Sequence, residues 1–158
     1  MNVLLSVKPK YAEKIMGGEK KYEFRRSIFR RNDIETVYIY SSSPVSKITA
    51  AFKIERVLAD SPEKIWKLCH KYAGIPKKDF FEYFKNSDTA YAIEIVNVNI
   101  FQVPIDPCHV IENFVPPQSF YYLYFDFLQS QCNIQDTEII KPDSLTESIS
   151  EVSFMRQL

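Results

Sequence analysis

Residues 17–26, with the sequence GGEKKYEFRR, constrain the fold of this chain more than any other stretch. Two of the chain's three glycines open it, and glycine readily takes a positive φ or lets another group come close. The alternation that follows predicts a strand over 20–26, on which Lys21, Glu23 and Arg25 share one face. Such an ionic face suits either a solvated edge strand or a strand that lines a binding cleft.

The rest of the chain predicts short strands interrupted by helical segments. Alternating or β-branched runs indicate strands, and apolar residues at helical spacing between proline and glycine indicate helices. Ser61 is the predicted N-cap of the second helix, and residues 119–129 fit a helix or a strand. The expected strands are 2–7, 20–26, 36–40, 47–58 and 90–101, and the expected helices are 9–16, 62–73 and 76–84. This order is not a regular strand–helix alternation, so it predicts an α+β fold on a small, closed or partly closed barrel.

Charge is distributed unevenly along a chain whose formal net charge is zero. Residues 1–85 hold 18 of the 20 basic side chains against 10 acidic ones, whereas residues 86–158 hold 2 against 10. Such asymmetry indicates a basic face that attracts polyanions and an acidic part elsewhere. Lysine-rich helices that merely face water would give the same composition.

Length and composition fit one domain with an appended C-terminal segment. We expect a barrel domain over 1–128 and an acidic extension over 129–158 that docks on the barrel. The chain has no apolar run of membrane-spanning length and no signal peptide pattern, so no membrane association is expected. Its three widely spaced cysteines fit reduced thiols in the cytoplasm better than a disulfide framework.

The motif Gly18-x-Lys20-x-x-Glu23-x-Arg25 resembles the G-x-K-x-x-E-x-R signature of the ASCH domain, a branch of the PUA-like barrels. The resemblance extends over roughly residues 2–125. Four further segments resemble that family in the same order, namely SVKP with YAEKI at 6–15, IYSSSP at 39–44, AYAI at 90–93 and PPQSF at 116–120.

The resemblance implies a small PUA-like β-barrel of about five to six mixed strands with two to three flanking helices. It also implies a cleft beside the signature that binds RNA or modified nucleotides, and some relatives resemble ribonucleases. One bacterial branch is an amidohydrolase that releases acetate from N4-acetylcytidine with a lysine at the position of Lys20 and a threonine at that of Glu23. Because glutamate replaces that threonine here, the sequence favours binding over this hydrolysis.

The candidate ligand-binding residues follow from the motif and its surroundings. A guanidinium grips phosphate or a base edge in a planar fork, a carboxylate accepts from a base amino group, and a desolvated lysine acts as nucleophile or base. The opposing interpretation is an ion pair that only fixes the strand. A bulge after the glycines would bring Lys20 to the side of Glu23. The predicted ligand-binding set is Lys8, Lys20, Glu23, Arg25, Arg26, Ser42 and Tyr91, with Lys20 and Glu23 catalytic only if the protein is an enzyme.

Several tyrosines are candidates for stacking on a base, although aromatic residues at alternating strand positions more often belong to a core. They are Tyr38, Tyr40, Tyr91 and Tyr121, and Tyr91 is favoured. Arg30 and Arg31 extend the basic rim for a nucleic-acid backbone.

No cofactor or metal is expected, because the two Cys-His pairs at 69–70 and 108–109 lack metal-ligand spacing. Cys69 lies on an apolar helix stripe and is expected to be packed and unreactive. Three functions remain open. The favoured one is an RNA- or modified-nucleotide-binding module, the second is a nucleoside amidohydrolase or ribonuclease, and the third is a protein-interaction module whose acidic C-terminal part contacts a partner.

Overall fold

The computed structural model describes residues 1–127 of the chain. Backbone contacts divide the chain into two units, and the sheet, its helices and the candidate site all lie in the first, Met1–Tyr124. The predicted extension over 129–158 lies outside the described residues.

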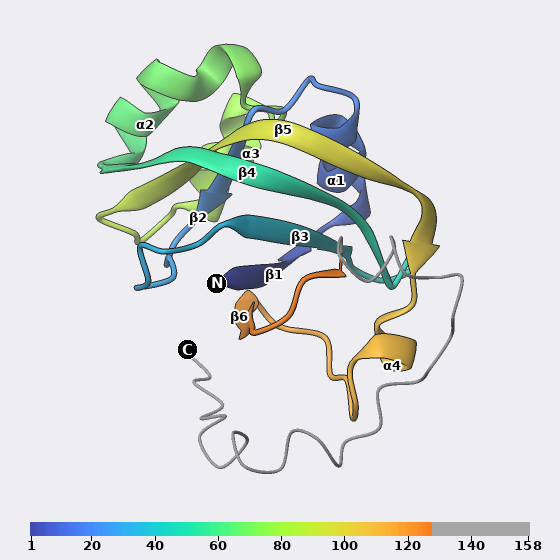
Figure 1. Ribbon diagram of the computed structural model, residues 1–158. Coiled ribbons are helices and arrows are strands. Elements are labelled where there is room, and N and C mark those ends of the chain that lie inside the picture. The colour runs from blue at the N-terminus through green and yellow to red at the C-terminus, as the bar shows by residue number, and fades with distance from the viewer. Residues whose placement is uncertain (128–158) are drawn as a thin grey trace. The chain divides into compact units, whose positions relative to one another are not determined.

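A six-stranded mixed sheet curls into a half-barrel, which confirms the predicted fold class (Figure 1). The strand order is β2-β5-β4-β3-β1-β6. β1 and β3 pair in parallel, and all other neighbours are antiparallel. The strands are β1 (Asn2–Val7), β2 (Tyr22–Arg25), β3 (Thr36–Ser41), β4 (Lys47–Asp60), β5 (Ala90–Ile105) and β6 (Phe120–Leu123).

The helices occupy the connections between these strands. They are α1 (Pro9–Met16), α2 (Pro62–Cys69), the 3₁₀ helix η1 (His70–Tyr72), α3 (Lys77–Tyr83) and the short α4 (Pro107–Val110). The helix after β4 begins at Pro62 as predicted, but the Ser61 side chain makes no capping bond. Instead, the side chain of Asp60, the residue before Ser61, turns toward the start of the helix, and its carboxylate accepts a hydrogen bond from the Ser61 amide at 2.7 Å.

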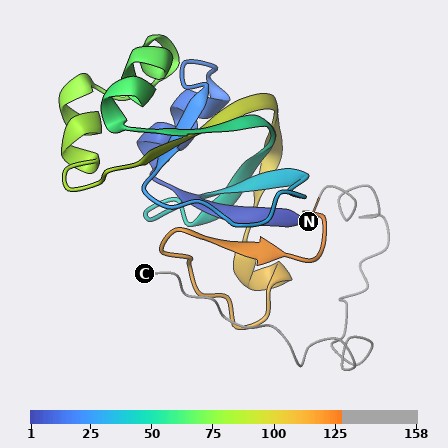
Figure 2. The same ribbon diagram turned by 90° about the vertical axis from the view of Figure 1, so that its left-hand side faces the viewer.

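Two apolar clusters cover opposite faces of the sheet where β2 pairs with β5. The first includes Ile93 together with residues of β1, β3, β4 and α1. The second packs Phe24 and Ala92 against α2 and α3, which lie together beside β2 in both views (Figures 1 and 2). Glu23 opposes Ile93 and Phe24 opposes Ala92 in the β2–β5 register. Since opposed residues share a face, Glu23 and Arg25 point to the α1 side and Phe24 to the α2–α3 side.

The strand predicted over 20–26 is shorter in the structure and begins at Tyr22. Before it, the amide of Lys20 donates to the Lys14 carbonyl at 3.0 Å, and that of Lys21 to the Tyr72 carbonyl at 2.9 Å. These two amides therefore bind helix α1 and η1 rather than a neighbouring strand. The segment 119–129, which fitted a helix or a strand, contains β6, antiparallel to β1.

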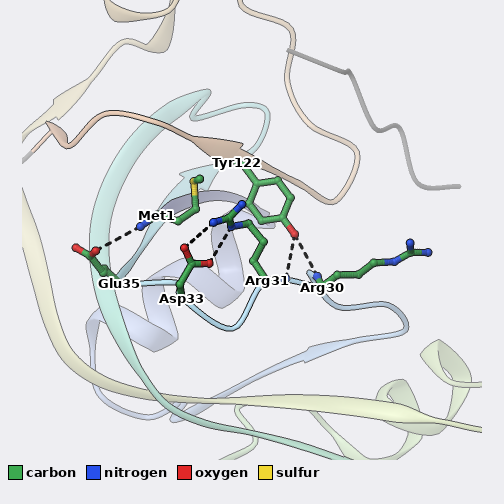
Figure 3. A network of polar contacts seen from close by, with 6 residues as sticks. All are labelled: Met1, Arg30, Arg31, Asp33, Glu35 and Tyr122. Atoms are coloured by element: carbon green, nitrogen blue, oxygen red, sulfur yellow. Dashed lines mark hydrogen bonds and ion pairs between the residues drawn. The ribbon is translucent and has the colours of Figure 1, made fainter. Parts of the chain in front are cut away.

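The loop between β2 and β3 is fixed by a polar network around Tyr122 of β6 (Figure 3). The Tyr122 hydroxyl accepts hydrogen bonds from the amides of Arg30 at 3.1 Å and Arg31 at 3.4 Å. The Arg31 guanidinium donates to both carboxylate oxygens of Asp33, at 2.8 and 2.6 Å. The Arg30 side chain extends away from the network. Both predicted rim residues are exposed, but the Arg31 guanidinium is already paired with Asp33.

Among the described residues, no helix combines the length and apolar character needed to cross a membrane.

Candidate functional site

Lys20 reaches its position through a glycine turn at the end of α1. Gly17 is the C-cap of the helix, and Gly18 follows with a φ of +77°, the left-handed conformation in which glycine is favoured. The turn places Lys20 directly before β2. The β2–β5 register is unbroken, so the lysine approaches Glu23 from this turn and not through the predicted bulge.

The Lys20 side chain is almost completely buried, with 3% of its surface exposed. Its Nζ donates to the Ala73 carbonyl at 3.0 Å and lies 3.5 Å from Oε2 of Glu23. It also lies 4.5 Å from the centroid of the Phe24 ring. A carbonyl, a carboxylate and an aromatic face thus replace the water that a buried ammonium loses.

Gly74 makes room for this lysine. Its φ is +63°, and a Cβ atom placed there would lie 2.5 Å from Cβ and 2.8 Å from Cγ of Lys20. Contacts that short do not occur between real side chains, so the glycine fulfils two requirements, a left-handed backbone and space for Lys20. The sequence marks Gly74 only as a helix stop. The close contact between Gly74 and Lys20 becomes evident only in the tertiary structure.

Glu23 lies between two cations on the α1 side of β2. Its carboxylate contacts Lys20 through one oxygen, and the other lies 3.9 Å from Nη1 of Arg25. Only 8% of its side-chain surface is exposed. A carboxylate in such surroundings needs both partners, because an unpaired buried charge is strongly unfavourable. The structure therefore brings together the three charged residues of the motif, and we call Lys20, Glu23 and Arg25 the buried ion cluster.

Arg25 directs its guanidinium toward the protein's own backbone. Nη2 donates to the carbonyls of Ser6 at 3.0 Å and Ser119 at 2.8 Å. The Ser6 amide also donates to the Ser119 carbonyl, at 2.9 Å. Arg25 thereby joins the edge strand β2 to β1 and to the segment that enters β6. Its Nε is buried and makes no hydrogen bond to any described residue. The sequence assigned this guanidinium to a ligand, but in the structure its Nη2 donates to two main-chain carbonyls.

Burial lowers the pKa of Lys20 below its ordinary value, and the nearby Glu23 carboxylate opposes this shift. Desolvation disfavours the charged ammonium, whereas a neighbouring carboxylate favours it. The net effect is a Lys20 pKa below the ordinary lysine value, so this amine loses its proton at a lower pH than an exposed lysine does. A lysine of this kind next to a carboxylate is equipped for proton exchange.

Three other predicted residues lie near the buried ion cluster. Lys8 follows β1 directly and is exposed, and the Ser42 amide donates to the Val7 carbonyl at 2.9 Å. The half-buried Tyr91 opposes Arg25 in the β2–β5 register. Arg25 itself contacts the Ser6 carbonyl. The backbones of all three residues therefore lie close to the end of β1 or to the adjoining end of β2.

Arg26 lies apart from this group. It comes directly after β2, and its guanidinium carbon lies 5.1 Å from the centroid of the Tyr83 ring on α3. Because its side chain reaches the α2–α3 side, it faces away from Glu23 and Arg25. The sequence grouped these arginines only by their proximity along the chain.

The tyrosines proposed for stacking differ in burial. Tyr38 and Tyr40 are 0% and 2% exposed, so their rings do not face a base, and the alternative that aromatic residues at alternating strand positions belong to a core holds for both. They belong to the core, where Tyr40 packs edge-on against Phe114. Burial also raises the pKa of the half-buried Tyr121. Two tyrosines with exposed rings, Tyr72 and Tyr83, lie outside the predicted set.

The cysteine and histidine pairs make no metal centre in residues 1–127, where no group of three His, Cys, Asp or Glu residues could hold an ion. Cys69 is buried against α3, and this burial raises the pKa of its thiol to about 11. It is therefore unreactive near neutral pH, as predicted. Cys108 is exposed on α4.

One surface hollow of about 460 Å³ lies between the start of α2 and the end of α3. It is lined by Ser61, Pro62, Glu63, Phe81, Phe84, Lys85, Asn86, Ser87 and Asp88. None of the predicted site residues contributes to it, and its lining mixes one lysine with two carboxylates. It offers no charge preference for a nucleic acid.

Comparison with known proteins identifies the family to which this half-barrel and its buried ion cluster belong. A model of the ASCH domain matches residues 5–103. The chain is therefore a member of the ASCH domain family.

The chain is also similar to individual proteins and to a solved structure. An "ASCH domain-containing ribonuclease" of Zymomonas mobilis is 25% identical over 126 residues, which cover 76% of this chain and 82% of the relative. A crystal structure of a ZmASCH point variant from the same organism has the same fold, with a TM-score of 0.76 and 23% identity over 84% of this chain and 97% of that one. The large ribosomal subunit protein uL22 of Ureaplasma parvum serovar 3 is 26% identical over 91 residues, which cover 58% of this chain and 29% of that protein.

Proposed function

We propose that this protein binds RNA. The observation that carries the proposal is a set of exposed cations around β1 and β2 that form no ion pair with any carboxylate in residues 1–127. They are Lys8, Lys10, Lys21, Arg26 and Arg30. Unpaired cations that release counterions on contact with phosphates provide the sequence-independent part of nucleic-acid affinity. The relative named as a ribonuclease, which aligns with three quarters of this chain, directs the proposal to RNA.

The ligand site that we propose lies at the end of β1, beside the buried ion cluster. Lys8 neutralises a phosphate there, Ser42 offers a hydroxyl, and the half-buried ring of Tyr91 lies against the base. Arg25 is already bonded to two carbonyls, so its part is to hold β1 and the Ser119 segment in position. Lys20 and Glu23 provide the charged wall behind them.

A binding measurement tests this proposal. Fluorescence anisotropy with a labelled single-stranded RNA should show saturable binding. The logarithm of the association constant should fall linearly with the logarithm of the salt concentration. Lys8→Gln should weaken binding and reduce the salt slope by about 0.7, the contribution of one contact to a single strand. Lys64→Gln is the matched control, because Lys64 is already paired with Asp60 at 3.2 Å. Absence of binding at low salt would refute the proposal.

RNA hydrolysis is a second candidate, favoured by the pairing of Glu23 with a lysine of lowered pKa. Such a pair provides a base and an acid for attack at a phosphodiester. Incubation with labelled RNA, and in parallel with N4-acetylcytidine, distinguishes ribonuclease from amidohydrolase activity. We expect any turnover to disappear in Lys20→Met under conditions in which its circular dichroism spectrum shows that this variant is still folded. Turnover that survives this substitution would remove Lys20 from the chemistry.

A further inference from the structure

Two exposed tyrosines, Tyr72 of η1 and Tyr83 of α3, contact the residues that flank β2 and have cations over their rings. Nζ of Lys21 lies 4.4 Å and Nζ of Lys71 lies 5.3 Å from the centroid of the Tyr72 ring. The guanidinium of Arg26 lies 5.1 Å from the centroid of the Tyr83 ring. Both tyrosines expose 37% of their surface. This combination of cation and aromatic face occurs at both ends of one strand.

The fold places these two pairs in a line along the edge of the sheet. β2 is the terminal strand, and Lys21 and Arg26 directly precede and follow it. The Lys21 amide donates to the Tyr72 carbonyl at 2.9 Å, which fixes η1 beside the start of β2. Four strand residues lie between Lys21 and Arg26, and the five extended steps from one to the other place their Cα atoms about 17 Å apart. Tyr72 and Tyr83 therefore mark the two ends of a strip, which we call the β2 strip.

The charge of the strip is uncompensated within the described residues. Lys21, Lys71 and Arg26 form no ion pair with any carboxylate in residues 1–127. Glu82, which adjoins Tyr83, lies 3.7 Å from Lys85, so its charge is already partnered.

Structural stabilisation does not account for the arrangement around Tyr72. One exposed cation over a ring contributes little to stability, and two lysines over the same ring repel each other. An anion beside the lysines compensates their charge, and a base that stacks on the partly exposed Tyr72 ring takes the place of a cation over it. The β2 strip thus fits a ligand that alternates phosphates with planar rings.

We propose that the β2 strip binds single-stranded RNA, with bases stacked on Tyr72 and Tyr83 and phosphates at Lys21, Lys71 and Arg26. Exposed aromatic faces between cations recognise unpaired bases, whereas a duplex hides its base faces. The span of about 17 Å corresponds to about five nucleotides at a stacked spacing of ~3.4 Å. The inference rests on the proposed RNA binding and adds a second contact surface, separate from the end of β1.

The test compares the affinity of full-length variants for a fluorescein-labelled, single-stranded RNA octanucleotide. We expect Tyr72→Ala and Tyr83→Ala each to weaken binding at least ~5-fold, the lower end of the loss of one stacked base. Tyr72→Phe and Tyr83→Phe should bind like the wild type, because phenylalanine keeps the stacking face. Tyr124→Ala is the matched control, since Tyr124 is 74% exposed and no cation of the described residues lies over its ring.

The cations provide an independent measurement. Lys21→Gln and Arg26→Gln should each reduce the salt slope by about 0.7, as single-strand phosphate contacts do. Unlabelled duplex RNA should compete poorly. Wild-type affinity in both alanine variants, or equal competition by duplex, would overturn the β2 strip while leaving RNA binding itself intact. If the wild-type protein fails to bind RNA at all, the proposed function fails first, and the two failures are thereby distinguished.

Discussion

Replacement of Gly74 by alanine tests whether Lys20 is held where the structure places it. The added Cβ would meet three carbons of Lys20, at 2.5, 2.8 and 3.1 Å. Gly18→Ala is the matched control, because Gly18 also has a positive φ of +77° but has no atom within 4 Å of the added Cβ. The two variants therefore share the backbone strain, and only Gly74→Ala adds the collision.

The magnitude of each effect follows from these contacts. A left-handed alanine costs roughly 1–2 kcal/mol, and the smaller freedom of the unfolded chain returns about 0.4–1 kcal/mol. Gly18→Ala should thus lower the free energy of unfolding by about 0.5–1 kcal/mol. Overpacking adds about 1–3 kcal/mol, so Gly74→Ala should lower it by about 2–4 kcal/mol.

Urea unfolding followed by far-ultraviolet circular dichroism measures both variants. With a slope of about 2 kcal/mol per molar urea, the midpoint of Gly74→Ala should fall roughly 1–2 M below that of the wild type. In a Lys20→Gly background, which removes the three contacting carbons, the further cost of Gly74→Ala should drop to that of Gly18→Ala. Equal losses for the two glycine variants in the wild-type background would refute the packing of Lys20 against Gly74.

Three further predictions follow from the same site. Lys20→Met leaves the buried Glu23 carboxylate without its nearer cation and should cost about 3–5 kcal/mol of unfolding free energy by urea titration. Because the pKa of Lys20 is lowered in the folded state, the unfolded chain binds more protons between that pKa and the ordinary value of 10.5. The unfolding free energy of the wild type should therefore rise relative to that of Lys20→Met as pH increases through this window. A relative fall would contradict the lowered pKa of Lys20. Arg25→Lys loses the planar guanidinium and should cost about 1.5–3 kcal/mol of unfolding free energy, with faster hydrogen exchange at the Ser6 amide. Unchanged protection of that amide would argue against the role of Arg25 in joining Ser6 to Ser119. Tyr122→Phe removes the acceptor of two loop amides and should cost about 0.5–1.5 kcal/mol, and unchanged exchange at both amides would show that the bonds are not formed in solution.

Much of the fold was predictable because it depends on local pattern. Alternating and β-branched runs placed β1, β3, β4 and β5, and proline–glycine punctuation placed α1 and the start of α2. The ambiguity at 119–129 had a physical cause, since an aromatic-rich segment suits either a helix or an edge strand until a partner is known. Pairing with β1 decided it.

The candidate site was only partly predictable. The motif correctly grouped Lys20, Glu23 and Arg25, because three and two residues along a chain are always near in space. The length of β2 was overestimated, since the amides of Lys20 and Lys21 bind α1 and η1, and no alternation along 20–26 reports such long-range partners.

The sequence by itself determined the strand and helix pattern, the charged motif and the concentration of basic residues in the first 85 positions. Only the tertiary structure decided that Ala73 and Gly74 enclose Lys20, that Arg25 donates to Ser6 and Ser119, and that Tyr72 rather than Tyr38 offers an exposed ring. The physical reason is that burial and hydrogen-bond partners depend on segments distant in the chain. Local alternation tells which residues share a face, and the packing of helices against the sheet tells which face is covered.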